Sequence, residues 1–244
     1  MRKTSSFLIV KFGKREHLEQ LQKGEIFFNA IETYRNDGTD YRGDSMEGRI
    51  PIDPAGIKIY DKEGKDILEK FPRPDIAYEG LVGDENSMMF CAAAITTEIL
   101  DNVSGNTWHF KEDFKSAIKN FGEYALLIWS SELIEHIART KDTSGQNIIY
   151  DSGPICYKDL ENYADMDNYR KSDNLDDRYF VKGLSYKNQN EWRVIIDGEK
   201  EALVANCGTG FILKTYPFQV SRLMTTEELL NGEIKIGKEE QDRT

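Results

Sequence analysis

The chain has 244 residues, of which 39% are hydrophobic and 31% charged, and its formal net charge at pH 7 is −11. A chain of this length can bury a substantial core, and we expect residues 1–244 to form a single domain whose C-terminal end, 236–244, is frayed. An extended nucleic-acid-binding surface is not expected, because such surfaces need clustered Lys and Arg side chains.

Cysteine usage and hydropathy narrow the class of protein further. Cys91, Cys156 and Cys207 are far apart and odd in number, so neither a disulfide framework nor a CxxC zinc pattern is available. The apolar run at 7–10 is too short for the core of a signal peptide, and no run approaches the roughly 18 apolar residues of a membrane span. We therefore expect a cytoplasmic protein with no membrane partner.

The first third of the chain predicts two strands around one helix, followed by a long loop. Residues 7–12 are apolar and β-prone, and 13–24 carry leucines at helical spacing before a closing glycine. Residues 25–31 predict the second strand. The stretch 34–49 is dense in Asp, Gly and Arg and predicts an exposed loop, while 51–86 mix β-prone pieces with turn residues and receive no assignment.

The middle of the chain has the clearest signals. Residues 87–96 are apolar and uncharged, which predicts a buried strand in the middle of a sheet. Apolar residues recur at helical spacing over 110–121 and predict an amphipathic helix. A strand at 124–129 should follow, and Ser130 can cap the next helix, which ends before the turn-rich stretch 141–147.

The last part of the chain predicts more strands and one short helix. The acidic segment 159–180 fits either a helix or an ordered loop. Thr225 and Glu228 have the spacing of a capping box, so a short helix should start there and stop at Gly232. Strands are expected at 148–157 (one or two), 185–196, 201–207 and 210–220. Together these elements predict an α+β fold with a mixed, mainly antiparallel β-sheet and a few short helices packed on it.

Gln189 and Glu191 stand two residues apart in the predicted strand 185–196. Alternate residues of a strand share a face, so Gln189, Glu191 and Arg193 should point one way, and Trp192 should point into the core. The Gln189 and Glu191 side chains would then lie roughly 6–7 Å apart, close enough to touch one small ligand. Either Glu191 pairs with Arg193 on a solvated face, or this face is the wall of a cleft.

Four short motifs occur in an order that resembles a known family. They are Lys11 with Phe12, "GEIFF" from Gly24, "MMFCAAAIT" at 88–96 and "QNEWRVI" at 189–195. The set resembles a widespread bacterial family of uncharacterised function whose closing strand has the signature E/Q-x-E-W-R. That layout is similar to the ADP-ribosyltransferase superfamily, which implies an ADP-ribosyltransferase-like mixed sheet and NAD as the substrate.

The resemblance implies roles for individual residues. Glu191 would be the catalytic carboxylate that favours the cationic transition state as nicotinamide departs, and Gln189 would help to choose or orient the acceptor. Lys11 would take the basic role on the first strand and bind NAD, with His17 as the alternative. Tyr34 could stack on the nicotinamide ring, or it could be a loop-packing tyrosine.

The polar loop 34–49 is a candidate lid. Its arginines could meet a pyrophosphate, but its acidic residues would offset their charge. The arginines are Arg35, Arg42 and Arg49, and the acidic residues are Asp37, Asp40, Asp44 and Glu47.

Metal chemistry and cysteine catalysis are not favoured. The acidic residues Asp165, Asp167 and Asp173 lack the glycine and the closing glutamate of an EF-hand loop. The three histidines show no zinc-binding spacing, so no metal is expected. Cys91 lies within an apolar strand and is expected to be a core residue.

Two functions are favoured over a third, a nuclease-like metal site on the acidic segment. The first is an NAD-dependent ADP-ribosyltransferase-like protein of the bacterial toxin or antiviral-defence kind, whose macromolecular acceptor the sequence does not identify. The second is a non-enzymatic binding protein in phage–host conflict, which would use its acidic surface to engage a protein partner.

Overall fold

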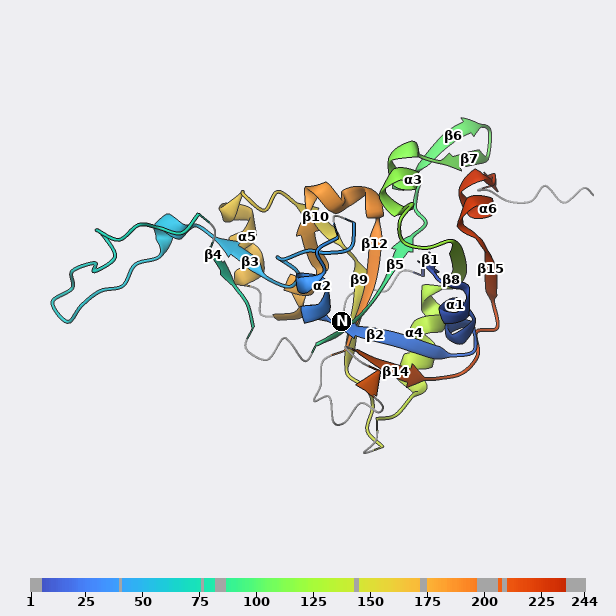
Figure 1. Cartoon of the computed structure of the whole chain (residues 1–244), viewed down its shortest axis with the longest axis horizontal. Coiled ribbons are helices and arrows are strands. Elements are labelled where there is room, and N and C mark those ends of the chain that lie inside the picture. The colour runs from blue at the N-terminus through green and yellow to red at the C-terminus, as the bar shows by residue number, and fades with distance from the viewer. Residues whose placement is uncertain are drawn as a thin grey trace, which may run out of the picture.

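A nine-stranded sheet forms the centre of the computed structural model, which describes residues 6–39, 41–75, 77–81, 87–142, 145–171, 175–196, 206–207 and 210–235 (Figure 1). The strand order is β13-β14-β2-β5-β1-β8-β15, with β12 paired to β5 and β9 paired to β12. Each of these pairings is antiparallel, which confirms the predicted α+β fold with a mainly antiparallel sheet. The strands are β1 (Leu8–Gly13), β2 (Glu25–Ala30), β5 (Met88–Ala94), β8 (Tyr124–Trp129), β9 (Tyr150–Pro154), β12 (Glu191–Ile196), β13 (Asn206–Cys207), β14 (Gly210–Lys214) and β15 (Ser221–Thr225).

The sheet forks at its central strand, β5. One edge of β5 pairs with β12 from Met88 to Ala93. The other edge is shared, because β1 pairs with Ala93 and Ala94 whereas β2 pairs with Met88 and Met89. Among the described residues, no ladder pair on that edge involves Phe90, Cys91 or Ala92. The strands β1 and β2 therefore diverge beside the middle of β5, and we call this opening the fork.

One face of the sheet packs on two helices. Phe90, Trp192 and Val194 belong to one hydrophobic cluster with apolar side chains of α1 (Arg15–Gln22) and α4 (Ser130–Arg139). The helix α1 links β1 to β2 and turns its leucines inward, as the helical spacing of its sequence predicts. Trp192 therefore points into the core, as predicted from the alternation of side chains along a strand.

The opposite face is covered by two smaller clusters. Val10, Phe12 and Ala93 pack against α3 (Glu112–Ile118) and α6 (Thr226–Asn231). Farther along the sheet, Met89 and Ile195 pack with the first residue of α2 (Ile31–Asn36) and with Tyr179 and Phe180. Both faces of β5 and β12 are thus buried, which accounts for the apolar run that predicted β5.

Smaller sheets and 3-10 helices lie outside the main sheet. The strands β3 (Ile50–Ile52) and β4 (Ala77–Glu79) pair next to α5 (Tyr163–Arg170), and the described residues between these two strands form an arm that extends away from the rest of the molecule (Figure 1). Two further sheets join β10 (Cys156–Lys158) to β11 (Val181–Gly183), in parallel, and β6 (Leu100–Ser104) to β7 (Thr107–Phe110) and β16 (Ile234–Lys235). The 3-10 helices are η1 (Pro54–Gly56), η3 (Thr97–Ile99), η4 (Leu175–Phe180) and η5 (Leu184–Gln189).

Most predicted elements are present. The strands at 7–12, 25–31, 87–96 and 124–129 and the helices at 13–24 and 130–139 are confirmed with small shifts in their ends. The cap predicted at Ser130 is wrong, because Ser130 is the first residue of its helix and its hydroxyl accepts from the Phe7 backbone. The segment 148–157 holds two strands, and 159–180 holds the helix α5 and the 3-10 helix η4. The capping box is confirmed: the Thr225 side chain accepts from the Glu228 backbone, and the Glu228 side chain accepts from the Thr225 backbone.

Three boundaries were predicted wrongly. The helix expected at 110–121 is shorter, because Phe110 ends β7 and α3 starts at Glu112. The strand expected at 210–220 ends at Lys214, and a separate strand, β15, follows it. The strand expected at 185–196 starts only at Glu191.

Two predictions concern residues outside the described part. The frayed end at 236–244 and most of the strand at 201–207 lie beyond the described residues. Among the helices that are described, none is long and apolar enough to cross a membrane.

Candidate functional site

A cleft of about 570 Å³ opens at the fork of the sheet. Its volume lies within the roughly 300–1,000 Å³ that is usual for small-molecule sites. Its walls come from β1, α1, β2, α2, β5 and β12 and from the loop after α2. All five residues predicted to form a site line this one cleft: Lys11, His17, Tyr34, Gln189 and Glu191.

Gln189 reaches the cleft differently from what the sequence predicts. It is the last residue of η5, and Asn190 then adopts a left-handed conformation with φ 45° before β12 starts at Glu191. The Asn190 Nδ2 donates hydrogen bonds to the carbonyl of Ala94 at 2.7 Å and to the hydroxyl of Thr96 at 2.9 Å. Asparagine adopts this backbone conformation more readily than most residues, and the two bonds to the end of β5 hold its side chain in place. The placement of Gln189 within the strand was therefore wrong.

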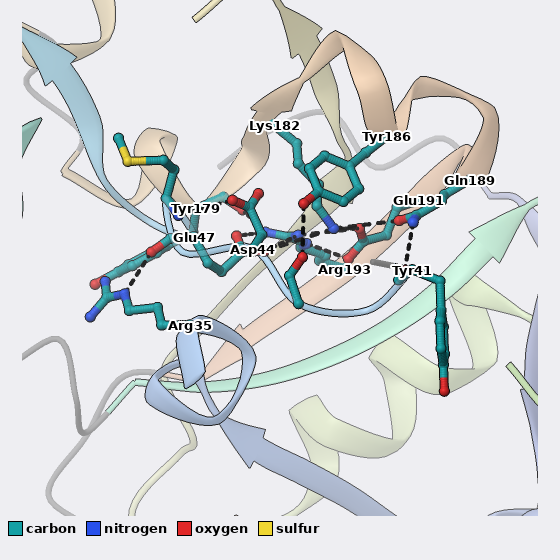
Figure 2. A network of polar contacts seen from close by, with 12 residues as sticks. Arg35, Tyr41, Asp44, Glu47, Tyr179, Lys182, Tyr186, Gln189, Glu191 and Arg193 are labelled. Carbon is teal, nitrogen blue, oxygen red and sulfur yellow. Dashed lines mark hydrogen bonds and ion pairs between the residues drawn. The ribbon is translucent and has the colours of Figure 1, made fainter. Parts of the chain in front are cut away.

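Glu191 lies in a buried network of charged side chains (Figure 2). Its Oε1 accepts from Arg193 Nε at 2.6 Å, and its Oε2 accepts from Arg193 Nη2 at 3.2 Å and from Lys182 Nζ at 3.1 Å. Lys182 also donates to Gln189 Oε1 at 3.4 Å and lies over the Tyr186 ring. The expected pair of Glu191 with Arg193 exists, but the face is not solvated, since Glu191 is 8% exposed and Arg193 is 0% exposed.

Glu47 completes this network by bonding the two terminal nitrogens of Arg193. Its two carboxylate oxygens accept from Arg193 Nη1 and Nη2 at 2.5 and 2.8 Å, and its Oε2 lies 3.9 Å from Lys182 Nζ. Glu47 belongs to the loop that the sequence predicts to be exposed, yet it is only 2% exposed. The network therefore holds two carboxylates and two cations.

The protonation states of the network follow from these pairs. Burial raises the pKa of Glu191, but the charges of Arg193 and Lys182 lower it by more, so the pKa lies well below its usual range. Burial lowers the pKa of Lys182, but Glu191 and Glu47 raise it by more. Glu191 is therefore an anion at neutral pH.

Lys11 lies at the fork itself. Its Nζ donates to the carbonyl of Cys91 at 2.5 Å and lies 4.7 Å from the centre of the Phe90 ring. Cys91 is one of the three β5 residues without a ladder partner on that edge, so the lysine supplies the missing donor. Burial lowers the pKa of Lys11.

Tyr34, His17 and Cys91 differ in their surroundings. Tyr34 is partly buried on α2, where burial raises the pKa of its phenol well above its usual value. His17 is exposed on α1 at the wall of the cleft. Burial also raises the pKa of the Cys91 thiol, which keeps it protonated and supports the expectation that Cys91 is no nucleophile.

The loop after α2 forms a wall of the cleft. Gln189 Nε2 donates to the carbonyl of Tyr41 and Tyr186 OH donates to the carbonyl of Gly43, both at 2.8 Å. Of the three arginines predicted in this loop, only Arg42 lines the cleft. Arg35 Nε instead donates to the carbonyl of Glu47 at 2.8 Å, and Arg49 lies over the Tyr78 ring.

The charge of the cleft wall differs from that of the whole chain. Against a formal charge of −11 for the chain, the wall has five Lys and Arg side chains and four carboxylates. A ligand with a negatively charged part is thus not repelled from this surface. The cations are Lys11, Lys14, Arg42, Lys182 and Arg193, and the carboxylates are Glu25, Asp37, Glu47 and Glu191.

Sequence reasoning missed two members of the site. Lys182 lies in β11, in a stretch with no recognisable motif, and Glu47 was considered only as a charge that offsets the loop arginines. The one usable signal for Glu47 is its place in the Asp- and Arg-rich loop 34–49, which the sequence suggests as a candidate lid.

Within the described residues no group of three or more His, Cys, Asp or Glu side chains is arranged to hold a metal. Comparisons with family models, curated proteins and solved structures found no match to this chain.

Proposed function

We propose that this protein is an ADP-ribosyltransferase-like enzyme that cleaves the bond between nicotinamide and ribose in NAD. The observation that carries the proposal is that Lys11 and Gln189, from separate sequence motifs, line one cleft together with Tyr34 and His17 around a buried, anionic Glu191. Motif residues that merely stabilised the fold would have no reason to meet at one opening.

The proposed chemistry is electrostatic. As the glycosidic bond breaks, its electron pair leaves with nicotinamide and positive charge develops on the ribose carbon. The carboxylate of Glu191 would stabilise that charge, which exists only near the transition state. An acceptor nucleophile then bonds to the ribose carbon and releases its proton to solvent, and Gln189 is close enough to orient it.

Binding would use two cations of the cleft wall. Lys11 and Arg42 both line the cleft, and Arg42 is near enough to lower the pKa of Lys11. Two neighbouring cations suit a pyrophosphate, whose charge would relieve their mutual repulsion. Tyr34 offers an aromatic ring at the same wall for the nicotinamide, and His17 lies at its edge.

The test is nicotinamide release from NAD by the purified wild type and by Glu191→Gln, with and without cell lysate as a source of acceptors. We expect release by the wild type and a loss of at least about 100-fold in the variant. Glu112→Gln, at a carboxylate that is 84% exposed on α3 and outside the cleft, is the matched control and should keep full activity.

Two outcomes contradict the proposal. Equal turnover by wild type and Glu191→Gln would show that this carboxylate is not catalytic. No release by either, with no NAD binding in calorimetry, would favour the alternative of a non-enzymatic binding protein.

The biological role that we propose for the enzyme is that of a cytoplasmic toxin or antiviral effector. Induced expression in bacteria should then arrest growth with the wild type and not with Glu191→Gln.

A further inference from the structure

The cleft holds four buried charged side chains, and the proposed function uses only one of them directly. Lys182, Glu191 and Arg193 come from β11 and β12, whereas Glu47 comes from the loop after α2. Their exposed fractions are 4%, 8%, 0% and 2% respectively for Lys182, Glu191, Arg193 and Glu47. Burying four charges is costly unless each is paired, so the arrangement of the pairs is informative.

Arg193 has no donor left for a ligand. A guanidinium carries five N–H groups, and five hydrogen bonds account for all of them. Two go to Glu191, two to Glu47 and one, of 2.7 Å from Nη1, to the carbonyl of Tyr179. Arg193 therefore does not bind a phosphate of the substrate, although it lines the cleft.

The same bonds fix the plane of the Glu191 carboxylate. Glu191 and Arg193 are on one face of β12, and the guanidinium bonds both oxygens of the carboxylate from one side (Figure 2). At the adjoining edge of the guanidinium, Glu47 accepts hydrogen bonds from Nη1 and Nη2 with its two carboxylate oxygens. Arg193 is thus clamped between two carboxylates, and the orientation of Glu191 depends on Glu47 through it.

Glu47 also controls how strongly the two cations act on Glu191. Both Arg193 and Lys182 have Glu47 as a second anionic neighbour, at 2.5 Å and 3.9 Å. Without the Glu47 carboxylate, Glu191 would be the only anion facing the positive charges of Arg193 and Lys182 in this network. The negative charge that Glu191 presents to a ribose cation would then be weakened.

We propose that Glu47 and Arg193 are positioning residues for Glu191, with Glu47 holding the guanidinium that orients the catalytic carboxylate. This inference rests on the proposed function. In this inference Glu47, a residue of the predicted lid loop, holds Arg193 in place and does not bind the substrate.

The kinetic test compares the wild type with Glu47→Gln, which removes the charge and one acceptor oxygen at nearly constant volume. We expect kcat for nicotinamide release to fall about 10- to 100-fold while KM for NAD changes less than about threefold, because a misplaced catalytic group costs rate and not ground-state binding. Arg193→Lys should show the same split, since it keeps the charge but loses the fork. A raised KM with unchanged kcat, or wild-type kinetics, would overturn the inference.

A control separates positioning from loss of stability. The Glu132 carboxylate is 15% exposed, accepts hydrogen bonds from the backbone of Gln219 and Val220, and lies outside the cleft. Glu132→Gln should lower the melting temperature and leave kcat unchanged. If Glu47→Gln does not fold, Glu47→Asp serves instead, because its side chain is too short to keep both bonds to Arg193.

A second measurement does not depend on activity. Ligand-free crystal structures of the wild type and Glu47→Gln should show a changed or disordered Glu191 carboxylate in the variant. An unchanged Glu191 side chain would refute its positioning by Glu47. A wild type that releases no nicotinamide would remove the proposed function alone, since the comparison of the two structures would still decide whether Glu47 orients Glu191.

Discussion

Replacing Glu191 by Gln should destabilise the protein and leave it folded. The change removes a negative charge that faces Arg193 and Lys182 at 2.6 and 3.1 Å in a site where Arg193 is fully buried. Removing one partner of a buried ion pair costs about 3–5 kcal/mol, and the total stability of a domain is about 5–15 kcal/mol. Glu47 still pairs with Arg193 in the variant, so the native state survives.

Thermal unfolding measures this cost. For a chain of this size each kcal/mol lowers the melting temperature by about 2–4 °C, so we expect Glu191→Gln to melt about 6–20 °C below the wild type at pH 7. Glu112→Gln, at an exposed site, should melt with the wild type.

The difference should depend on pH. The pKa of Glu191 is lower in the folded state than its ordinary value of 4.5. A depressed pKa contributes stability that is present above the unfolded-state pKa and is lost as the pH falls through the folded-state value. The gap in melting temperature between wild type and Glu191→Gln should therefore be constant near neutrality and shrink as the pH falls below 4.5.

The reasoning would be refuted by two results. Equal melting temperatures at pH 7 would mean that the ion pairs of Glu191 contribute nothing to stability. A gap that widens on acidification would mean that Glu191 is protonated in the folded state, against the sign expected for a carboxylate between two cations.

Three further predictions concern other parts of the structure. Arg42→Ala should raise KM for NAD about tenfold with little change in kcat, since the side chain is proposed only to bind; a fall in kcat alone in steady-state kinetics would contradict this. Gly24→Ala should lower the free energy of unfolding in urea by more than about 1–2 kcal/mol, because Gly24 has φ +91° and a Cβ there would lie 2.4 Å from the carbonyl oxygen of Tyr216. Thr225→Ala should lower it by about 1 kcal/mol by removing the cap that bonds the Glu228 backbone, and an unchanged urea midpoint would show that this cap is dispensable.

The sequence predicted the elements whose side chains have a clear period. The apolar run of β5 arises because both faces of that strand are buried. The alternation in β12 arises because Trp192 and Val194 face the apolar core whereas Glu191 and Arg193 face the buried charged network. The hairpin of β6 and β7 was not predicted, since the side chains of β6 after Leu100 are exposed and carry no such pattern.

The sequence predicted five residues of the candidate site, but it did not predict the contacts that Glu47 and Lys182 make there. Local motifs selected Lys11, Gln189 and Glu191, and the structure brings them to one cleft. The contacts of Glu47 and Lys182 with this site depend on how a loop and a distant strand close over β12, which no local pattern encodes. The break at residue 190 was missed for a different reason: apolar and polar side chains alternate from Leu184 to Lys187 as they would in a strand, although these residues form the 3-10 helix η5.

The forked edge of β5 has a mechanical consequence for the cleft. Only two ladder positions join β1 to β5 and only two join β2 to β5, and they lie at opposite ends of the strand. A small change in the twist of β5 around Cys91 would therefore swing the two neighbouring strands apart or together without breaking any ladder pair. We therefore expect the twist of β5 to affect the width of the cleft, within the limits set by α1, which links β1 to β2 and packs on both halves of the sheet.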